Sequence, residues 1–231
     1  MSGFSPAFTR LGAAFAAVVL HQQETLADFL PRAEWSADLT AREYLTGGVT
    51  VRVSLLGSYA ERERTWLWGW ANPQFGPQHA AVAPTLPVRE LGERLGVSEL
   101  VTQEVDLTWY DGPAAHGGEP IAMVAVGLLG GGGYIGARYD GGSAYLHVDD
   151  PQVPKATWDP EQLSRLILGS VALFPDDHQL TVARYLSHHG VAYRRTPEAI
   201  EAFLPDGGIG RASFDAAGRF ARWETIRAAT A

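Results

Sequence analysis

The spacing of hydrophobic and polar residues changes several times along the chain. Between Phe8 and Phe29, apolar residues recur every three or four positions, which is the spacing of one face of an α-helix. This helix must end before Pro31, because proline has no N–H to donate and restricts the residue before it. The chain therefore opens with a helix of about six turns.

Strand-like segments follow the first helix. They are rich in β-branched and aromatic residues and are separated by polar or glycine turns, and they cover residues 35–39, 49–56 and 65–71. Connections this short join only antiparallel neighbours. The simplest arrangement is an antiparallel meander.

The middle of the chain mixes helical and strand patterns. Residues 87–95 have proline at the start and Gly96 at the C-cap position, which predicts a helix. Residues 100–109 alternate like a strand, and 112–118 form a loop. Residues 121–129 are wholly apolar, so they form either a buried helix or a central strand; we favour a helix.

The last third is predicted to be helical and to end in a hairpin. A β-rich segment at 134–148, interrupted by a glycine turn, precedes helices at 161–173 and 177–188. The terminal hairpin spans 209–223. The acidic residues before the second helix suit its N-terminus, while His188 and His189 would place positive charge at its C-terminus.

These elements define an α+β fold in which a curved antiparallel meander packs against helices. The architecture resembles a hot-dog fold, with a helical C-terminal part ending in a β-hairpin, a likeness that says nothing about function. We expect one domain over residues 1–231, with a subdomain break near 149–157, where two prolines interrupt the chain.

Composition excludes several classes of function. The 231 residues are 46% hydrophobic and carry a formal charge of −8, which argues against nucleic acid because phosphate binding needs clustered Lys and Arg. The absence of cysteine excludes thiol nucleophiles and Cys-ligated zinc. No apolar run is long enough to span a membrane, so we expect a cytoplasmic protein that does not bind membranes.

Three short motifs carry a family resemblance: WSADL at 35–39, LLGSY at 55–59 and TWLWGWANP at 65–73. Together with residues 91–93, 139–142 and 214–219, they make the chain similar to a mainly actinobacterial family of domains of unknown function. The resemblance covers most of the sequence. It supports a single folding unit and implies no catalytic residue.

Aromatic residues are the most prominent candidates for a binding site. Trp66, Trp68 and Trp70 stand two apart, so on a strand their indoles would share one face. The row could wall a ligand pocket or pack as core beneath a helix. With Tyr139 and Tyr145 of the following β-rich segment, these are the predicted ligand-binding residues.

Two further motifs have a chemical and a structural interpretation. Residues 131–136 match G-x-G-x-x-G, but turn residues follow where a dinucleotide site requires a helix, so a helix-to-strand connection is the better interpretation. His147 and Asp149 would share one strand face and are the candidate catalytic pair, although an ordinary strand exit also explains them. We predict no cofactor and no metal site.

Two functions fit these features. The first is a small-molecule-binding domain, or an enzyme, whose aromatic-lined apolar pocket lies between the sheet and the helix at 121–129. The alternative is an acidic interaction module, such as an immunity-type protein, that binds a basic partner through its negative surface. The sequence leaves the oligomeric state open.

Overall fold

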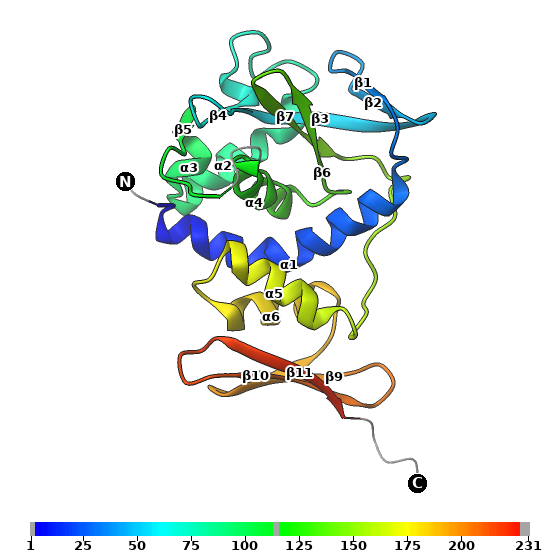
Figure 1. Ribbon diagram of the computed structural model, residues 1–231, viewed down its shortest axis with the longest axis vertical. Helices are drawn as coiled ribbons and strands as arrows, with labels where there is room; N and C mark the ends of the chain where they lie inside the picture. Colours follow the sequence, from blue (N-terminus) through cyan, green and yellow to red (C-terminus); the bar gives the residue numbers. More distant parts are fainter. Residues whose placement is uncertain (1–2, 113–115, 227–231) are drawn as a thin grey trace. The chain divides into compact units, whose positions relative to one another are not determined.

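The computed structural model describes residues 3–112 and 116–226, and their contacts divide the chain into two compact units (Figure 1). Unit 1 comprises Met1–Phe8 and Gln22–Lys155, and unit 2 comprises Thr9–His21 and Ala156–Ala231. The change from unit 1 to unit 2 at Lys155 falls in the segment 149–157, where the sequence has two prolines. A single domain for the whole chain stays a prediction.

The first helix, α1 (Pro6–Phe29), begins and ends where the sequence predicts and supplies residues to both units. Ser5 is its N-cap and accepts a hydrogen bond from the backbone N–H of Phe8. Pro6 occupies the first turn, where its missing N–H is not needed, and Leu30 closes the helix before Pro31. No helix in the described part of the chain has both the length and the apolar character to cross a membrane.

Unit 1 is built on a seven-stranded antiparallel sheet. In chain order its strands are β1 (Trp35–Asp38), β2 (Glu43–Thr46), β3 (Val49–Ala60), β4 (Thr65–Trp68), β5 (Glu104–Asp106), β6 (Tyr134–Tyr139) and β7 (Gly142–Val148). The first half of β3 pairs with β2, and its second half pairs with both β4 and β7. The β3–β7 pairing is irregular between Leu55 and Gly57, and such a bulge increases local twist.

Helices fill the inner side of this curled sheet, as Figure 1 shows for α2 (Leu86–Leu95), α3 (Ser98–Val101) and α4 (Glu119–Leu129). Every side chain of α4 from Pro120 to Val126 is buried, which explains why its sequence has no polar face. Gly96 closes α2 with a positive φ of 66°, as expected of a C-cap glycine. The predicted α+β fold with an antiparallel meander is therefore confirmed.

Two predicted strands of unit 1 were wrong in part. The strand expected over 65–71 stops at Trp68, and a 3-10 helix, η1 (Gly69–Ala71), follows. The strand expected over 100–109 is reduced to the three residues of β5, because its first residues belong to α3. Part of the loop predicted at 112–118, residues 113–115, lies outside the described residues.

Unit 2 packs two helices against a four-stranded antiparallel sheet (Figure 1). The helices are α5 (Leu163–Leu173) and α6 (His178–His188), and the strands are β8 (Tyr193–Arg195), β9 (Ala199–Phe203), β10 (Ile209–Phe214) and β11 (Phe220–Ile226). Both helices and the β10–β11 hairpin are confirmed predictions. Asp177 caps α6 by accepting from the backbone N–H of Leu180 at 2.8 Å. Strands β8 and β9 were missed because they are short and carry several charged residues.

Candidate functional site

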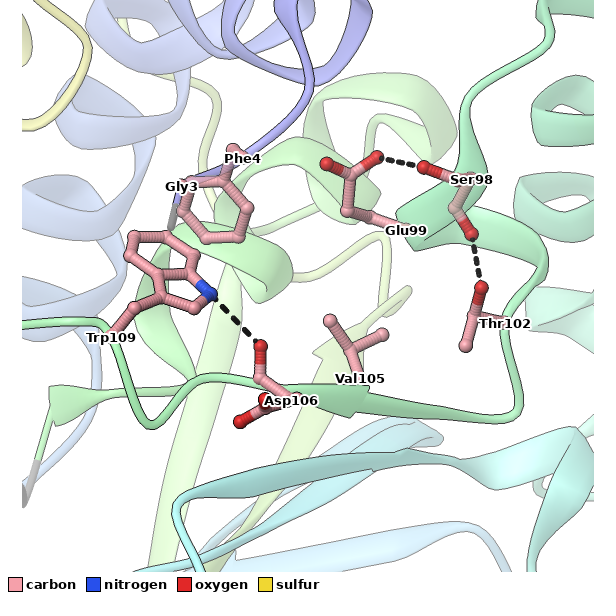
Figure 2. Close-up of a pocket in the computed structure, with 8 residues that line it drawn as sticks. All are labelled: Gly3, Phe4, Ser98, Glu99, Thr102, Val105, Asp106 and Trp109. Atoms are coloured by element: carbon pink, nitrogen blue, oxygen red, sulfur yellow. Dashed lines mark hydrogen bonds between the residues drawn. The ribbon is translucent and has the colours of Figure 1, made fainter. Parts of the chain in front are cut away.

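A pocket of about 190 Å³ lies in unit 1 beside the first residues of the described chain (Figure 2). It is lined by Gly3, Phe4, Ser98, Glu99, Thr102, Val105, Asp106 and Trp109. These residues come from the segment that precedes α1, from α3 with the residue that follows it, and from β5 with its following turn. Three separate stretches of sequence therefore build one site.

Aromatic rings form one wall of this pocket. The rings of Phe4 and Trp109 meet edge to face with their centroids 4.7 Å apart, and Phe4 also contacts Phe8 of α1. The Trp109 indole N–H donates to the backbone oxygen of Asp106 at 3.0 Å, which fixes the ring in the turn after β5 (Figure 2). The wall is therefore apolar, and its two rings are fixed by separate contacts, Phe4 by Phe8 and Trp109 by the backbone of Asp106.

The Asp106 side chain is committed to its own turn. Its carboxylate accepts from the backbone N–H of Thr108 at 2.9 Å, and hydrogen bonding from Thr108 lowers the pKa of Asp106. Asp106 therefore contributes its backbone and a local turn to the pocket.

The Glu99 carboxylate is the main polar feature of the site. Glu99 is only 8% exposed, and its two oxygens accept from the backbone N–H of Ser5, from the Ser5 hydroxyl at 2.8 Å and from the Ser98 hydroxyl at 3.0 Å. None of the described Arg, Lys or His side chains pairs with it. Within residues 3–112 and 116–226, the Glu99 carboxylate is thus held by neutral donors.

The backbone around Glu99 is also fixed. The indole N–H of Trp68 donates to the Glu99 backbone oxygen at 2.9 Å, and the Thr102 hydroxyl donates to the backbone oxygen of Ser98 at 2.8 Å (Figure 2). Both bonds restrain α3, which has only four residues and could not be stable alone. A rigid backbone keeps the carboxylate in one place.

The structure places the three predicted indoles in different surroundings. Trp66 and Trp68 lie on β4, are fully buried and meet edge to face with centroids 5.3 Å apart. Trp70 lies in η1 rather than on the strand, and the Arg89 guanidinium sits 4.6 Å from its ring centroid. The faces of Trp66 and Trp68 are taken up by protein contacts, and none of the three indoles lines the pocket of Figure 2.

The two predicted tyrosines are not brought together. Tyr145 is buried on β7 against Trp66 and Tyr134, and burial followed by the charge of Glu119 raises its pKa. Tyr139 ends β6 and is about half exposed. A ligand-binding role for these five aromatic residues stays a prediction.

The candidate catalytic pair, His147 and Asp149, is held in separate interactions. The His147 Nε2–H donates to the backbone oxygen of Gly130 at 2.7 Å, and burial lowers the His147 pKa. Asp149 forms ion pairs with Arg42 and Arg52. Both residues stabilise the exit of β7, and neither lines the pocket. A catalytic role for either stays a prediction.

The glycine-rich segment after α4 is a connection, as predicted. Gly131 and Gly133 have positive φ angles, and the chain continues directly into β6 rather than into a helix. No helix N-terminus is therefore available at these glycines for a pyrophosphate.

A cluster of histidine and aromatic rings lies in unit 2 at the end of α6. The His189 ring lies 4.7 Å from that of Tyr185, 5.0 Å from His188 and 5.6 Å from His21. Burial, and then the charges of His188 and His21, lower the His189 pKa to about 4. Burial therefore disfavours the protonated form of His189, while His188 is the basic residue in the last turn of α6. No group of three or more His, Asp or Glu within residues 3–112 and 116–226 is arranged to hold a metal ion.

Comparison with known proteins places the chain in a family. The model of the family of unknown function DUF6882 matches residues 9–151, so the chain belongs to that family. The match spans β1 to β7 and therefore includes the sheet of unit 1 and its helices. No curated protein and no solved structure shows significant similarity to the chain.

Sequence reasoning missed the residues that form this pocket. Glu99 lies in a stretch whose pattern gives no sign of burial, and its partner Ser5 is 94 positions away. The one available signal was Ser5 followed by Pro6, which marks a helix N-terminus but not its contact with α3.

Proposed function

We propose that the chain is a small-molecule-binding protein whose pocket takes a small organic cation with an apolar body. The observation that carries the proposal is Glu99, a buried carboxylate in the pocket wall with no cationic partner among the described side chains. Burying a charge is costly, and a charge of opposite sign offsets part of this cost. A bound ammonium group would supply that charge.

The aromatic wall supports the same ligand class. Ring faces and edges of Phe4 and Trp109 offer apolar contact, and aromatic rings attract cations when water is excluded. A dry cavity of about 150 Å³ can hold benzene, so the pocket has room for one ring or a short branched chain. A primary amine attached to such a group would place its ammonium group at the Glu99 carboxylate and its apolar body against Phe4 and Trp109. We expect the protein to bind this ligand in the cytoplasm, the location predicted from the sequence.

Pairs of probes that differ only in charge test this proposal. Thermal shifts of the full chain would be measured with benzylamine against benzyl alcohol, and with cyclohexylamine against cyclohexanol. Each amine is expected to bind at least about tenfold more tightly than its alcohol, a difference of about 1.4 kcal/mol. Equal shifts within each pair, or no shift with any probe, would contradict a cation site.

The acidic interaction module remains the second candidate because of how charge is distributed. Unit 2 contains nine Arg and nine Asp or Glu residues, so the formal charge of −8 belongs to unit 1. A negative unit would speed association with a basic partner and make the rate strongly dependent on salt. Asp149 counts against a simple acidic patch, since Arg42 and Arg52 already pair with it.

A binding measurement separates the two candidates. The full chain would be titrated with a basic model protein, hen lysozyme, at low and physiological ionic strength. The interaction module requires binding at physiological salt that an amine probe does not displace. Loss of all binding at that salt would leave only nonspecific charge attraction and remove this candidate.

A further inference from the structure

The sheet of unit 2 has one packed face and one exposed face. Side chains on the inner face, among them Ile200 of β9 and Ala212 of β10, belong to the hydrophobic core that the sheet forms with α5 and α6. Because successive side chains of a strand point to opposite sides of the sheet, every second residue of each strand lies on the side away from this core. That side, which we call the outer face, carries Phe203, Ile209 and Ile226, which are 50%, 38% and 55% exposed.

These three apolar residues form one continuous row. Ile209 of β10 pairs with Phe203 of β9 on one side and with Ile226 of β11 on the other. Directly opposed residues in antiparallel strands lie close enough for their side chains to touch. An exposed apolar row across three strands is more than the scattered hydrophobic residues of an ordinary surface.

The neighbouring row on the outer face is charged and alternates in sign. Arg194 of β8 pairs with Glu201 of β9, which pairs with Arg211 of β10, which pairs with Glu224 of β11. Ion pairs link Arg194 and Arg211 to Glu201. Read from β8 to β11, the row is therefore positive, negative, positive, negative.

We propose that the outer face binds a second copy of the chain, face to face, about a two-fold axis that runs parallel to the strands between β9 and β10. This axis reverses the order of the strands in the second copy, so that β8 faces β11 and β9 faces β10. It keeps positions along the strand direction unchanged, so that the charged row faces the charged row and the apolar row faces the apolar row. Arg194 then faces Glu224 of the second copy, and Glu201 faces Arg211 of the second copy. In the apolar row, Phe203 faces Ile209 of the second copy. Every contact is formed twice, as in an isologous dimer.

Charge supports a second copy as the occupant. The alternating row complements itself about this axis, whereas a uniformly basic or acidic partner would meet like charge at two of its four positions. The formal charge of unit 2 is zero, so two copies of it do not repel each other as whole units. Two sheets with strands in line also pack in the commonest sheet-on-sheet geometry.

The area of the outer face sets the expected strength. The strands β8, β9, β10 and β11 hold 3, 5, 6 and 7 residues. At about 3.4 Å per residue and about 4.8 Å between strands, the sheet covers about 340 Å² on each copy. The total of about 700 Å² lies below the size of a standard stable interface. The dimer should therefore be reversible, with a Kd in the micromolar range.

Sedimentation velocity of the full chain tests the proposal, at concentrations from about 5 to about 200 µM to bracket a micromolar Kd. The unmodified chain is expected to dimerise across this range. Ile209→Glu puts a carboxylate in the apolar row opposite Phe203 of the second copy and should raise the Kd at least about tenfold. Leu168→Glu on α5, at a residue that is 54% exposed, is the matched control and should leave the Kd unchanged.

A charge exchange tests the orientation. Arg194→Glu and Glu224→Arg should each weaken the dimer, because each creates two contacts between like charges. An equal mixture of these two variants should dimerise again, since each variant supplies the charge that the other needs. Recovery in the mixture also shows that both variants are folded.

Three results would overturn the proposal. The first is an unmodified chain that stays monomeric up to about 200 µM, where a micromolar Kd gives mostly dimer. The second is a dimer that Ile209→Glu leaves intact, which would place the contact on another surface. The third is a mixture of the charge variants that shows no more dimer than either variant alone.

Discussion

Ser5 makes two hydrogen bonds to the Glu99 carboxylate, one from its backbone N–H and one from its hydroxyl. The same Ser5 hydroxyl oxygen accepts from the backbone N–H of Phe8 and so caps α1. One side chain thus fixes the start of α1 and holds the buried charge in the pocket wall.

Ser5→Ala should destabilise unit 1. The substitution removes the helix cap and one hydrogen bond to a buried carboxylate, which together should cost about 1–3 kcal/mol. Urea unfolding measures the loss, with Ser36→Ala on the exposed strand β1 as control. A cost no larger than that of the control would show that the Ser5–Glu99 contact contributes nothing to stability.

Trp68 and Trp66 offer a matched pair for the hydrogen bond to Glu99. Both indoles are buried, but the Trp68 N–H donates to the Glu99 backbone oxygen, whereas the Trp66 N–H has no partner among the described residues. Trp68→Phe should therefore cost about 1–2 kcal/mol more than Trp66→Phe, because it leaves a buried carbonyl unpaired. Equal losses in urea unfolding would count against a structural role for this bond.

Gly69→Ala should be severely destabilising. A Cβ there would lie 2.7 Å from the backbone oxygen of Leu55, and a backbone atom cannot move aside as a side chain can. We expect a cost of about 2–3 kcal/mol from this overpacking. Gly136 of β6 is the control, since a Cβ there would meet its nearest neighbour at 3.9 Å. Melting temperatures should fall for Gly69→Ala and stay constant for Gly136→Ala; similar values for both would contradict the close approach at Gly69.

Acidic pH should destabilise the C-terminal end of α6. The pKa of His189 is about 4 in the folded chain against an ordinary value of 6.5, so protonation favours the unfolded state. The stabilisation is fully present above pH 6.5 and is lost as the pH falls from 6.5 to 4. We expect His189 to contribute about 1 kcal/mol to this loss, since solvent screens part of the effect.

Hydrogen exchange of peptides from α6 measures this pH effect. Protection should fall between pH 6.5 and 4.5, after correction for the intrinsic exchange rate, and His189→Gln should reduce the fall. His178 at the other end of α6 provides the control, because its Nδ1 accepts from the backbone N–H of Phe220. A fall that His189→Gln leaves unchanged would assign the effect to other groups.

The parts of the fold that depend on local pattern could be predicted. Apolar spacing in α1, the proline and glycine at the two ends of α2, and the glycine turn of the β10–β11 hairpin are signals within a few residues. In each case neighbouring residues carry the information.

The parts that depend on distant contacts could not be predicted. Thr65–Trp68 continues as a 3-10 helix in which Gly69 closely approaches the backbone of Leu55 and Leu56 in β3, an approach that the alternation of residues does not reveal. The pocket is hidden for the same reason, since the burial of Glu99 depends on Ser5, 94 residues earlier. A charged residue in an exposed-looking stretch gives no local sign that it will be buried.

Isothermal titration of the full chain with benzylamine, comparing Glu99→Gln with the unmodified protein, tests the central claim most directly. Gln is close to Glu in shape and keeps one oxygen that can accept from Ser5, but its NH2 group replaces the other oxygen, so the substitution removes the charge and one hydrogen-bond acceptor. We predict that Glu99→Gln weakens benzylamine binding at least about tenfold, while Glu104→Gln, which removes an exposed carboxylate on β5, leaves it unchanged. Equal affinity of the unmodified protein and Glu99→Gln, or no heat of binding with the unmodified protein, would contradict the claim that this carboxylate binds a cation.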